Sequence, residues 1–179
     1  MNTFKNPNIH LFKYCPQCGR EQLIVSSEKS FACKTCHFKF YLNTAAAGIA
    51  LIFDNKKLIV TKRKHDPEKG MLDLPGGFAD PGESIEGCLI REIKEELNLD
   101  IIELNYFCSV PNTYIYNEVT YTITDFAFIC KVKSFESIIA CDDISDFYFF
   151  HLSDIDRKSF GLDSPKIVID KLLKKNPFT

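Results

Sequence analysis

The segment Gly76–Leu99, with the sequence GGFADPGESIEGCLIREIKEELNL, constrains the fold of this 179-residue chain more than any other. Its first seven residues contain three glycines and one proline, so they predict a loop that turns sharply and brings the backbone close to another group. The part from Ser84 to Leu97 has helical periodicity, because apolar residues recur on one face at Ile85, Leu89, Ile93 and Leu97. We therefore expect a glycine-rich loop followed by a helix that packs on a sheet.

Three glutamates lie together on this predicted helix. Glu92, Glu95 and Glu96 fall beside the apolar stripe when the residues are placed at 100° intervals. They repel one another and lie near the helix C-terminus, where the dipole disfavours negative charge. A counter-cation is therefore expected, and Mg²⁺ or Mn²⁺ prefers oxygen ligands in this arrangement. The plainer alternative is an acidic helix face relieved by solvent and by Lys94.

The N-terminal region carries two C-x-x-C pairs. Cys15 and Cys18 are followed, after 14 residues, by Cys33 and Cys36. Pairs at this spacing form a tetrahedral thiolate site for Zn²⁺, and four sulfur ligands leave no open position for catalysis. About 40 residues bury too little surface to fold unaided, so the metal should supply stability. We predict a structural zinc ribbon over residues 1–42, with short strands near Leu23–Val25 and Phe38–Tyr41.

From residue 43 onward the pattern predicts strands and helices. Ala45–Phe53 and Leu58–Thr61 flank a turn sequence, which indicates a hairpin. Further strands are predicted at Tyr121–Val132 and Asp146–Leu152, and a second helix at Ser164–Lys174. A mixed sheet covered by helices is the simplest arrangement, so we expect an α+β domain over residues 43–179.

Composition excludes several classes of function. With 22 basic and 24 acidic residues, the net charge of -2 gives no field that would attract nucleic acid or an anionic membrane. Lys29, Lys34 and Lys39 of the ribbon form no dense basic run, so nucleic acid is not expected as a partner. No apolar run is long enough to span a membrane, and Met1–His10 lacks the apolar core of a signal peptide. We expect a cytoplasmic protein.

Gly77, Glu83 and the run Arg91–Leu99 together resemble the signature of the Nudix hydrolases, G-x5-E-x7-R-E-U-x-E-E-x-G-U, where U is apolar. The one departure is Asn98, where the family has its last glycine. This position ends the helix in a left-handed conformation, which asparagine tolerates next best after glycine. The resemblance implies a Nudix-type mixed sheet sandwiched between helices, and hydrolysis of a nucleoside diphosphate that is linked to another group.

The resemblance also implies roles for individual residues. Divalent cations would be held by four residues of the signature, namely the carbonyl of Gly77 and the side chains of Glu92, Glu95 and Glu96. Glu83 and Arg91 would form an ion pair that fixes the loop against the helix and orients these ligands. Such ions neutralise charge on a pyrophosphate and lower the pKa of a bound water. The general base would be a signature glutamate or an acid from a later loop, where Asp143 is the first candidate; a solvated turn is the alternative.

A four-cysteine ribbon joined to a Nudix domain resembles the NADH pyrophosphatase group. That group has the motif S-Q-P-W-P-F-P-x-S after the signature, whereas Ser109–Tyr114 here keeps the Ser and one Pro but lacks the Trp and Phe. ADP-ribose and NAD(H) are therefore the first candidate substrates, with release of a nucleoside monophosphate. The group is commonly dimeric, so a homodimer is expected.

Three further residues are candidates for substrate contacts. Tyr114 could stack on a base, and Lys62 and Lys64, which alternate onto one face of a strand end, could meet a phosphate. A buried strand aromatic and an exposed basic strand end are the plainer explanations. The alternative function is a non-catalytic Nudix ligand sensor whose ribbon contacts nucleic acid or a protein.

Overall fold

The structure is a computed structural model that describes residues 6–175. The chain divides into two compact units. The first contains the chain up to Thr44 together with Thr113–Thr122, and the second contains Ala45–Asn112 and the chain from Ile123 onward. A stretch from the middle of the sequence therefore belongs to the same unit as the N-terminal region.

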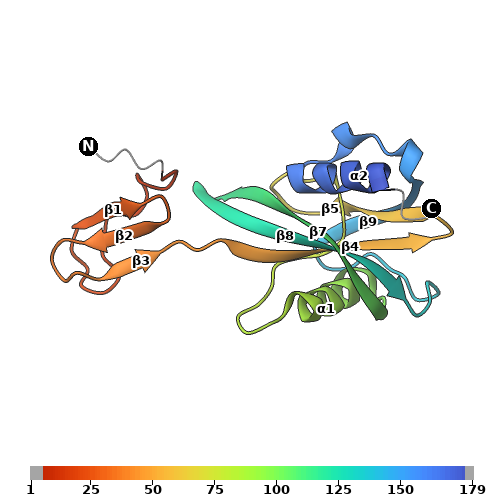
Figure 1. The fold of residues 1–179 in the computed structure, drawn as a ribbon, viewed down its shortest axis with the longest axis horizontal. Helices are drawn as coiled ribbons and strands as arrows, with labels where there is room; N and C mark the ends of the chain where they lie inside the picture. The colour runs from red at the N-terminus through yellow and green to blue at the C-terminus, as the bar shows by residue number, and fades with distance from the viewer. Residues whose placement is uncertain (1–5, 176–179) are drawn as a thin grey trace. The chain divides into compact units, whose positions relative to one another are not determined.

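The first unit is built on a small antiparallel sheet with the order β1-β2-β3 (Figure 1). Its strands are β1 (Leu23–Ser27), β2 (Ser30–Cys33) and β3 (Lys39–Tyr41). Phe31 is fully buried, and its ring centroid lies 5.2 Å from that of Phe12 and 6.4 Å from that of Phe40. The sequence predicted β1 and β3, but the four residues of β2 are too few to give a periodic signal.

The second unit is built on a six-stranded mixed sheet, in which five strands have the order β6-β5-β4-β8-β7 and the sixth, β9, pairs with β5 (Figure 1). β4 runs parallel to β8 and antiparallel to β5, and β5 runs antiparallel to β6 and β9. The elements of this unit, two of which extend into the first, are β4 (Ala45–Asp54), β5 (Lys57–Arg63), β6 (Leu72–Asp73), α1 (Ile85–Leu97), β7 (Ile101–Tyr116), β8 (Val119–Val132), β9 (Ile144–His151) and α2 (Asp163–Lys175), with short 3₁₀ turns at Leu152–Asp154 and Arg157–Ser159.

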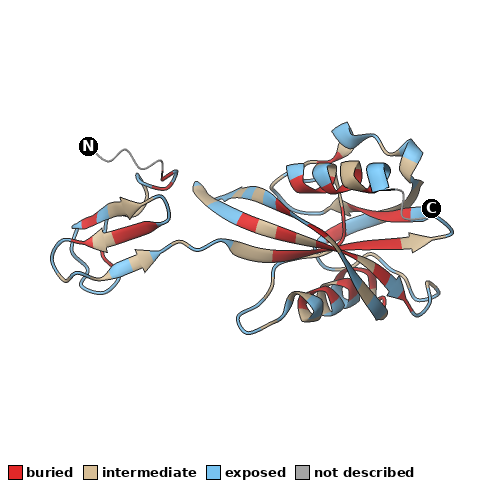
Figure 2. Ribbon diagram, in the orientation of Figure 1, coloured by how far each residue is buried: buried red, intermediate tan, exposed pale blue. Residues whose placement is uncertain are grey.

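The sheet carries one hydrophobic core on each face, and each core is covered by one helix (Figures 1 and 2). Successive residues of β5 alternate between the two cores, as the pleat of a strand requires. Leu58 and Val60 join the core beneath α2, whereas Ile59 joins the core beneath α1. The predicted mixed sheet between two helices is confirmed.

The end of the β7–β8 hairpin is held by one side chain of the first unit. Asn117 and Glu118 join the two strands with φ angles of 46° and 67°, which suit a two-residue hairpin turn. The Nδ2 of Asn8 donates to the carbonyl of Thr120 (2.8 Å), and the Oδ1 of Asn8 accepts from the amide of Thr120 (2.7 Å). The amide side chain of Asn8 thus pairs with the strand as another backbone would.

Most predicted elements lie close to their expected bounds. Both helices begin and end within one residue of the predictions, and the predicted β4–β5 hairpin is confirmed. Strand β7 was not predicted, because its sequence mixes polar residues with Pro111 and shows no regular alternation. Within residues 6–175, no helix combines the length and apolar character that crossing a membrane requires.

Candidate functional site

The glycine-rich loop reaches β4 before the chain enters α1. The amide of Gly48 donates to the carbonyl of Gly77 (2.8 Å), which holds the loop against the strand. A Cβ on Gly76 would lie 2.1 Å from the carbonyl oxygen of Gly48, and Gly76 has a φ angle of +140°. A Cβ on Gly77 would lie 2.3 Å from the Cδ of Glu92. Glycine is therefore required because backbone approaches β4 on one side and a carboxylate on the other.

Helix α1 has a defined cap at each end. The Oγ of Ser84 accepts from the amide of Gly87 (3.1 Å) at the N-terminus. At the C-terminus, Asn98 has a left-handed φ angle of 52°, and its amide donates to the carbonyls of Ile93 and Lys94. Asn98 thus adopts the conformation expected from the sequence, and it fixes the end of the helix that carries the glutamates.

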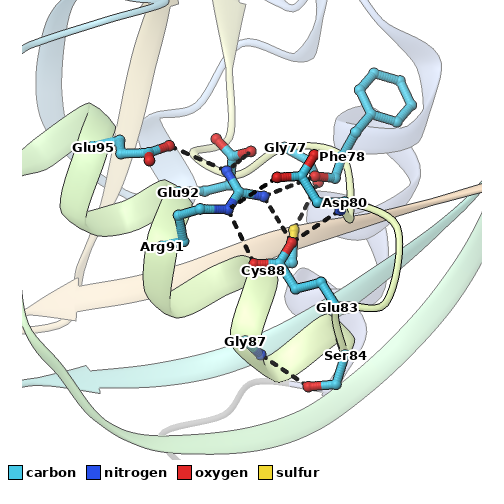
Figure 3. Close-up of polar contacts among 10 residues, drawn as sticks. All are labelled: Gly77, Phe78, Asp80, Glu83, Ser84, Gly87, Cys88, Arg91, Glu92 and Glu95. Atoms are coloured by element: carbon cyan, nitrogen blue, oxygen red, sulfur yellow. Dashed lines mark hydrogen bonds and ion pairs between the residues drawn. The ribbon is translucent and has the colours of Figure 1, made fainter.

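The guanidinium of Arg91 connects several acidic side chains (Figure 3). It donates to Glu83 through Nε (3.0 Å) and Nη2 (2.8 Å), which makes this ion pair bidentate and lowers the pKa of Glu83. Its Nη1 donates to Glu92 (2.7 Å) and to Glu95 (3.1 Å), and its Nη2 also donates to the carbonyl of Phe78 (3.1 Å). The structure places Glu83 and Arg91 in the expected pair and adds contacts to two of the three glutamates.

Glu96 lies on the inner side of the same helix end. It is 6% exposed, and its Oε2 accepts from the amide of Gly76 (3.0 Å). Burial raises the pKa of Glu96 to about 8, and the nearby carboxylates of Glu92, Asp73 and Asp143 act in the same direction. Burial also raises the pKa of Glu92, against the opposing effect of Arg91. A positive charge close to Glu92 and Glu96 would therefore stabilise their ionised forms, which burial disfavours.

The chemistry of this helix end suits a divalent cation. Glu92, Glu95 and Glu96 offer only oxygen atoms, which Mg²⁺ and Mn²⁺ prefer as ligands. A cation would also compensate the carboxylates whose pKa values burial raises. The absent side chain of Gly77 leaves its backbone directly against the Glu92 carboxylate. The Gly77 carbonyl itself accepts from the Gly48 amide and, at 3.4 Å, from the Sγ of Cys88.

The four ribbon cysteines form a second candidate metal centre. Their sulfur atoms all lie within 4.8 Å of one another, with 3.6 Å between Cys15 and Cys36 and 3.7 Å between Cys18 and Cys33. Four sulfurs bound at 2.3 Å around one Zn²⁺ would be separated by about 3.8 Å, so the cysteines have the spacing of a tetrahedral site. Within residues 6–175 this is the one group of at least three His, Cys, Asp or Glu ligands that converges so closely; the three glutamates do not.

The loop that precedes β9 lies over the C-terminal end of α1. The amide of Cys141 donates to the carbonyl of Glu96 (2.8 Å). Asp143, the candidate base, is in this loop with its side chain 77% exposed, and the Nε2 of His65 lies 3.9 Å from its Oδ1. Asp143 is near enough to Glu96 to raise its pKa. The structure thus brings the candidate base to the same helix end as the glutamates.

The three residues predicted to contact substrate have different surroundings. Lys62 lines a cleft on the sheet face that α2 covers. Lys64 lies beyond the end of β5, after an irregularity in the pairing with β9, and its Nζ donates to the carbonyl of Asp142 (2.8 Å). Tyr114 belongs to the first unit, where its ring centroid lies 6.5 Å from that of Tyr116. The extra residue at this irregularity, Ser145, belongs to β9, so the sharing of one face by Lys62 and Lys64 stays a prediction.

An ion pair beside the site was not predicted. The Nη1 of Arg63 donates to Asp73 (2.6 Å), and the Oδ1 of Asp73 accepts from the amide of Leu74 (2.9 Å). Burial raises the pKa of Asp73, and Arg63 acts in the opposite direction. This pair fixes the start of the segment that leads to Gly76. The pairing of β5 with the two-residue strand β6 brings the two side chains together, and so short a strand leaves no periodic signal.

Comparison with known proteins agrees with this geometry. Residues 42–170 match the NUDIX domain. The chain belongs to the Nudix family. A Nudix hydrolase from Nitrosomonas europaea shares the fold over 92% of both chains, with a TM-score of 0.70 and 19% sequence identity. The predicted family resemblance is therefore confirmed.

Two relatives of this Nudix chain have named activities. The ADP-ribose pyrophosphatase of Methanocaldococcus jannaschii is 34% identical over 78% of this chain and 79% of its own length. The NAD-capped RNA hydrolase NudC of Pseudomonas fluorescens is 32% identical over 52% of this chain and 34% of its own length. The chain thus spans only about a third of that NudC protein.

Proposed function

We propose that this Nudix protein is a hydrolase that depends on Mg²⁺ or Mn²⁺ and cleaves the pyrophosphate bond of a nucleoside diphosphate derivative, releasing a nucleoside monophosphate. The observation that carries the proposal is the presence of Glu92, Glu95 and Glu96 at the end of α1 that the glycine-rich loop contacts. Divalent ions held there neutralise charge on a pyrophosphate and lower the pKa of water.

ADP-ribose and NAD(H) are the first candidate substrates. The Methanocaldococcus jannaschii relative, which covers 78% of this chain and 79% of its own length, is named for ADP-ribose, and the NudC relative is named for NAD-capped RNA. Both are named as hydrolytic enzymes, which supports catalysis over a ligand sensor. The proposed substrate partner is a small molecule in which a nucleoside diphosphate is linked to a second group, as in the compound for which the Methanocaldococcus jannaschii relative is named.

The signature residues and Asp143 would have different roles in the reaction. The cations would be held by the carbonyl of Gly77 and the carboxylates of Glu92, Glu95 and Glu96. Some of the hydrogen bonds that these oxygens now accept would be replaced by bonds to the cations. Glu83 would keep Arg91 in place, so that Arg91 orients the glutamates. Asp143, exposed in the loop over the helix end, would accept the proton of the attacking water.

Other residues would bind substrate or stabilise the fold. Lys62, Lys64 and Tyr114 remain candidates for substrate contacts. Zn²⁺ held by Cys15, Cys18, Cys33 and Cys36 would stabilise the first unit. Such a thiolate site needs reduced cysteines, which supports a cytoplasmic location. A homodimer is the proposed assembly, and light scattering of the purified protein would test it.

A substrate panel with product identification tests the function. ADP-ribose, NADH and NAD⁺ are incubated with the protein and Mg²⁺ or Mn²⁺, and AMP is measured by chromatography. We expect Glu96→Gln to lower kcat at least about a hundredfold, whereas Glu86→Gln, in the exposed first turn of α1, should keep full activity. The proposal fails if the wild-type protein releases AMP from none of these compounds, or if Glu96→Gln is as active as wild type.

A further inference from the structure

The loop of residues 141–143, which we call the Asp143 loop, is fixed to the end of α1 that carries the glutamates. The amide of Cys141 donates to the carbonyl of Glu96 (2.8 Å), and the amide of Ile144 donates to the carbonyl of Cys141 (3.2 Å), which closes a turn. Within this turn, Asp142 has a left-handed φ angle of 49°. A residue other than glycine keeps that conformation where its surroundings hold it in place.

Lys64 holds the opposite side of the Asp143 loop with two hydrogen bonds. Its backbone amide donates to the carbonyl of Asp143 (3.0 Å), and its Nζ donates to the carbonyl of Asp142 (2.8 Å). The first bond continues the pairing of β5 with β9, in which Arg63 lies opposite Ile144. The second bond comes from a charged donor, and such bonds are stronger than those between neutral groups. The ammonium group of Lys64 therefore fixes the loop at its residue with left-handed backbone.

The carboxylate of Asp143 is turned toward the same segment. The Nε2 of the next residue, His65, lies 3.9 Å from the Oδ1 of Asp143, and the Asp143 side chain is 77% exposed. An exposed contact of this length contributes little to stability. The place that the carboxylate can reach is therefore set chiefly by the backbone of the Asp143 loop, which Lys64 holds.

We propose that Lys64 is a positioning residue for Asp143. Through its bonds to the Asp143 loop, it keeps the Asp143 carboxylate where that group can accept a proton from the water that attacks the substrate. This inference rests on the proposed function, in which Asp143 is the general base. The role differs from direct contact between Lys64 and a substrate phosphate, and the two roles predict different kinetics.

Steady-state kinetics of Lys64→Met, on the compound of the substrate panel that releases most AMP, tests this role. We expect kcat to fall about tenfold with KM nearly unchanged, because a misplaced base slows proton transfer and does not weaken binding. Lys64→Arg keeps a charged donor and should recover most of the lost kcat. Lys69→Met, at an exposed lysine of the same turn, is the matched control and should behave as wild type. A raised KM with unchanged kcat for Lys64→Met would show a substrate contact and overturn the proposal.

A double mutant separates positioning from an independent effect of Lys64. Asp143→Asn should lower kcat about a hundredfold, as expected for loss of a general base. In the Asp143→Asn protein, Lys64→Met should cause no further loss, because the group that Lys64 positions can no longer accept a proton. A further tenfold loss in the double mutant would overturn the proposal, and so would an Asp143→Asn variant that is as active as wild type.

Hydrogen exchange tests the hold on the Asp143 loop without any turnover. In Lys64→Met, the amide of Ile144 should exchange about tenfold faster, whereas the amide of Ile93 in α1 should stay protected. Unchanged exchange at Ile144 would overturn the proposal. If no compound of the panel is hydrolysed, the proposed function fails and the positioning role fails with it. If Glu96→Gln loses activity as expected but Lys64→Met keeps full kcat, only the positioning role fails.

Discussion

Gly76 and Gly82 lie in the same loop and both have positive φ angles, +140° and +87°, but only Gly76 is crowded. A Cβ on Gly76 would lie 2.1 Å from the carbonyl oxygen of Gly48, whereas nothing lies within 4 Å of a Cβ on Gly82. The amide of Gly76 also donates to Glu96. The first glycine is therefore tied both to the sheet and to a carboxylate of the site.

This difference gives a prediction for two alanine substitutions. Gly76→Ala should lower the free energy of unfolding by about 3 kcal/mol, because backbone strain is added to a clash with β4. Gly82→Ala should cost about 1 kcal/mol, from backbone strain alone. Urea denaturation followed by circular dichroism measures both. Equal losses would show that crowding at Gly76 does not matter.

Asp125 provides a test of pH dependence away from the glutamates. It is 4% exposed, and burial raises its pKa against the hydrogen bonds from Ser164 and Asn112. An acid with a raised folded pKa stabilises the protein below its ordinary value of about 4 and loses that contribution as pH rises through the folded value. Asp125→Asn cannot ionise, so it should be more stable than wild type at pH 8, and the difference should shrink toward pH 4.

Urea unfolding at pH 4, 6 and 8 measures the effect of Asp125→Asn. The exposed substitution Asp66→Asn serves as the control. A stability loss for Asp125→Asn that is the same at all three pH values would mean that the hydrogen bonds to Asn112 and Ser164, rather than the buried charge, decide the outcome.

At the scale of elements, the C-terminal end of α1 shows how the family glycine is replaced. The Nδ2 of Asn98 donates to the carbonyl of Ser137 (3.1 Å), and the Oγ of Ser137 donates to the carbonyl of Asn98 (3.2 Å). Glycine would relax the left-handed backbone but could not make the first of these bonds. Asparagine therefore connects the helix end to the loop that leads to Asp143.

Substitutions at Asn98 should reflect this balance. Asn98→Gly should change the free energy of unfolding by no more than about 1 kcal/mol, since relief of the left-handed strain offsets one lost hydrogen bond. Asn98→Val should destabilise by about 2 kcal/mol, because a β-branched residue tolerates this conformation poorly. Thermal unfolding distinguishes the two, and a larger loss for glycine than for valine would contradict this account.

Local elements were predicted from the sequence far better than contacts between them. The loop and α1 were predicted because glycine content, helical periodicity and the signature all lie within one segment. The cysteine cluster was predicted because two short spacings suffice. By contrast, the irregularity between β5 and β9 opposite Lys62 and Arg63 depends on how the two strands pair, and the contacts of Arg91 to Glu92 and Glu95 depend on side-chain placement. The periodicity of the sequence carries no information about strand pairing or about side-chain placement.

At the scale of the whole molecule, loss of the ribbon metal should affect the hairpin end of the first unit. The amide of Thr120 donates to Asn8, which lies seven residues before Cys15. If Zn²⁺ holds this unit together, its removal should expose that amide to solvent. Hydrogen exchange at Thr120 should therefore speed up by orders of magnitude in Cys18→Ser, while amides of α1 such as that of Ile93 stay protected.

Metal analysis and exchange mass spectrometry make this measurement. Wild type should contain one zinc per chain, and Cys18→Ser should contain much less. Cys141→Ser, outside the ribbon, is the matched control and should leave both zinc content and exchange unchanged. Unchanged exchange at Thr120 in a zinc-free protein would show that the hairpin end is held independently of the metal.

The sharing of Thr113–Thr122 with the N-terminal unit has a consequence for how such a protein can evolve. In a protein without the ribbon, the backbone of Thr120 would lose its hydrogen bonds to Asn8. The ten hairpin residues Thr113–Thr122 would also lose the rest of the unit to which they belong. Deletion of the ribbon should therefore be inherited together with a shortened hairpin. Homologues without the cysteine pairs are expected to have a correspondingly shorter connection between these two strands.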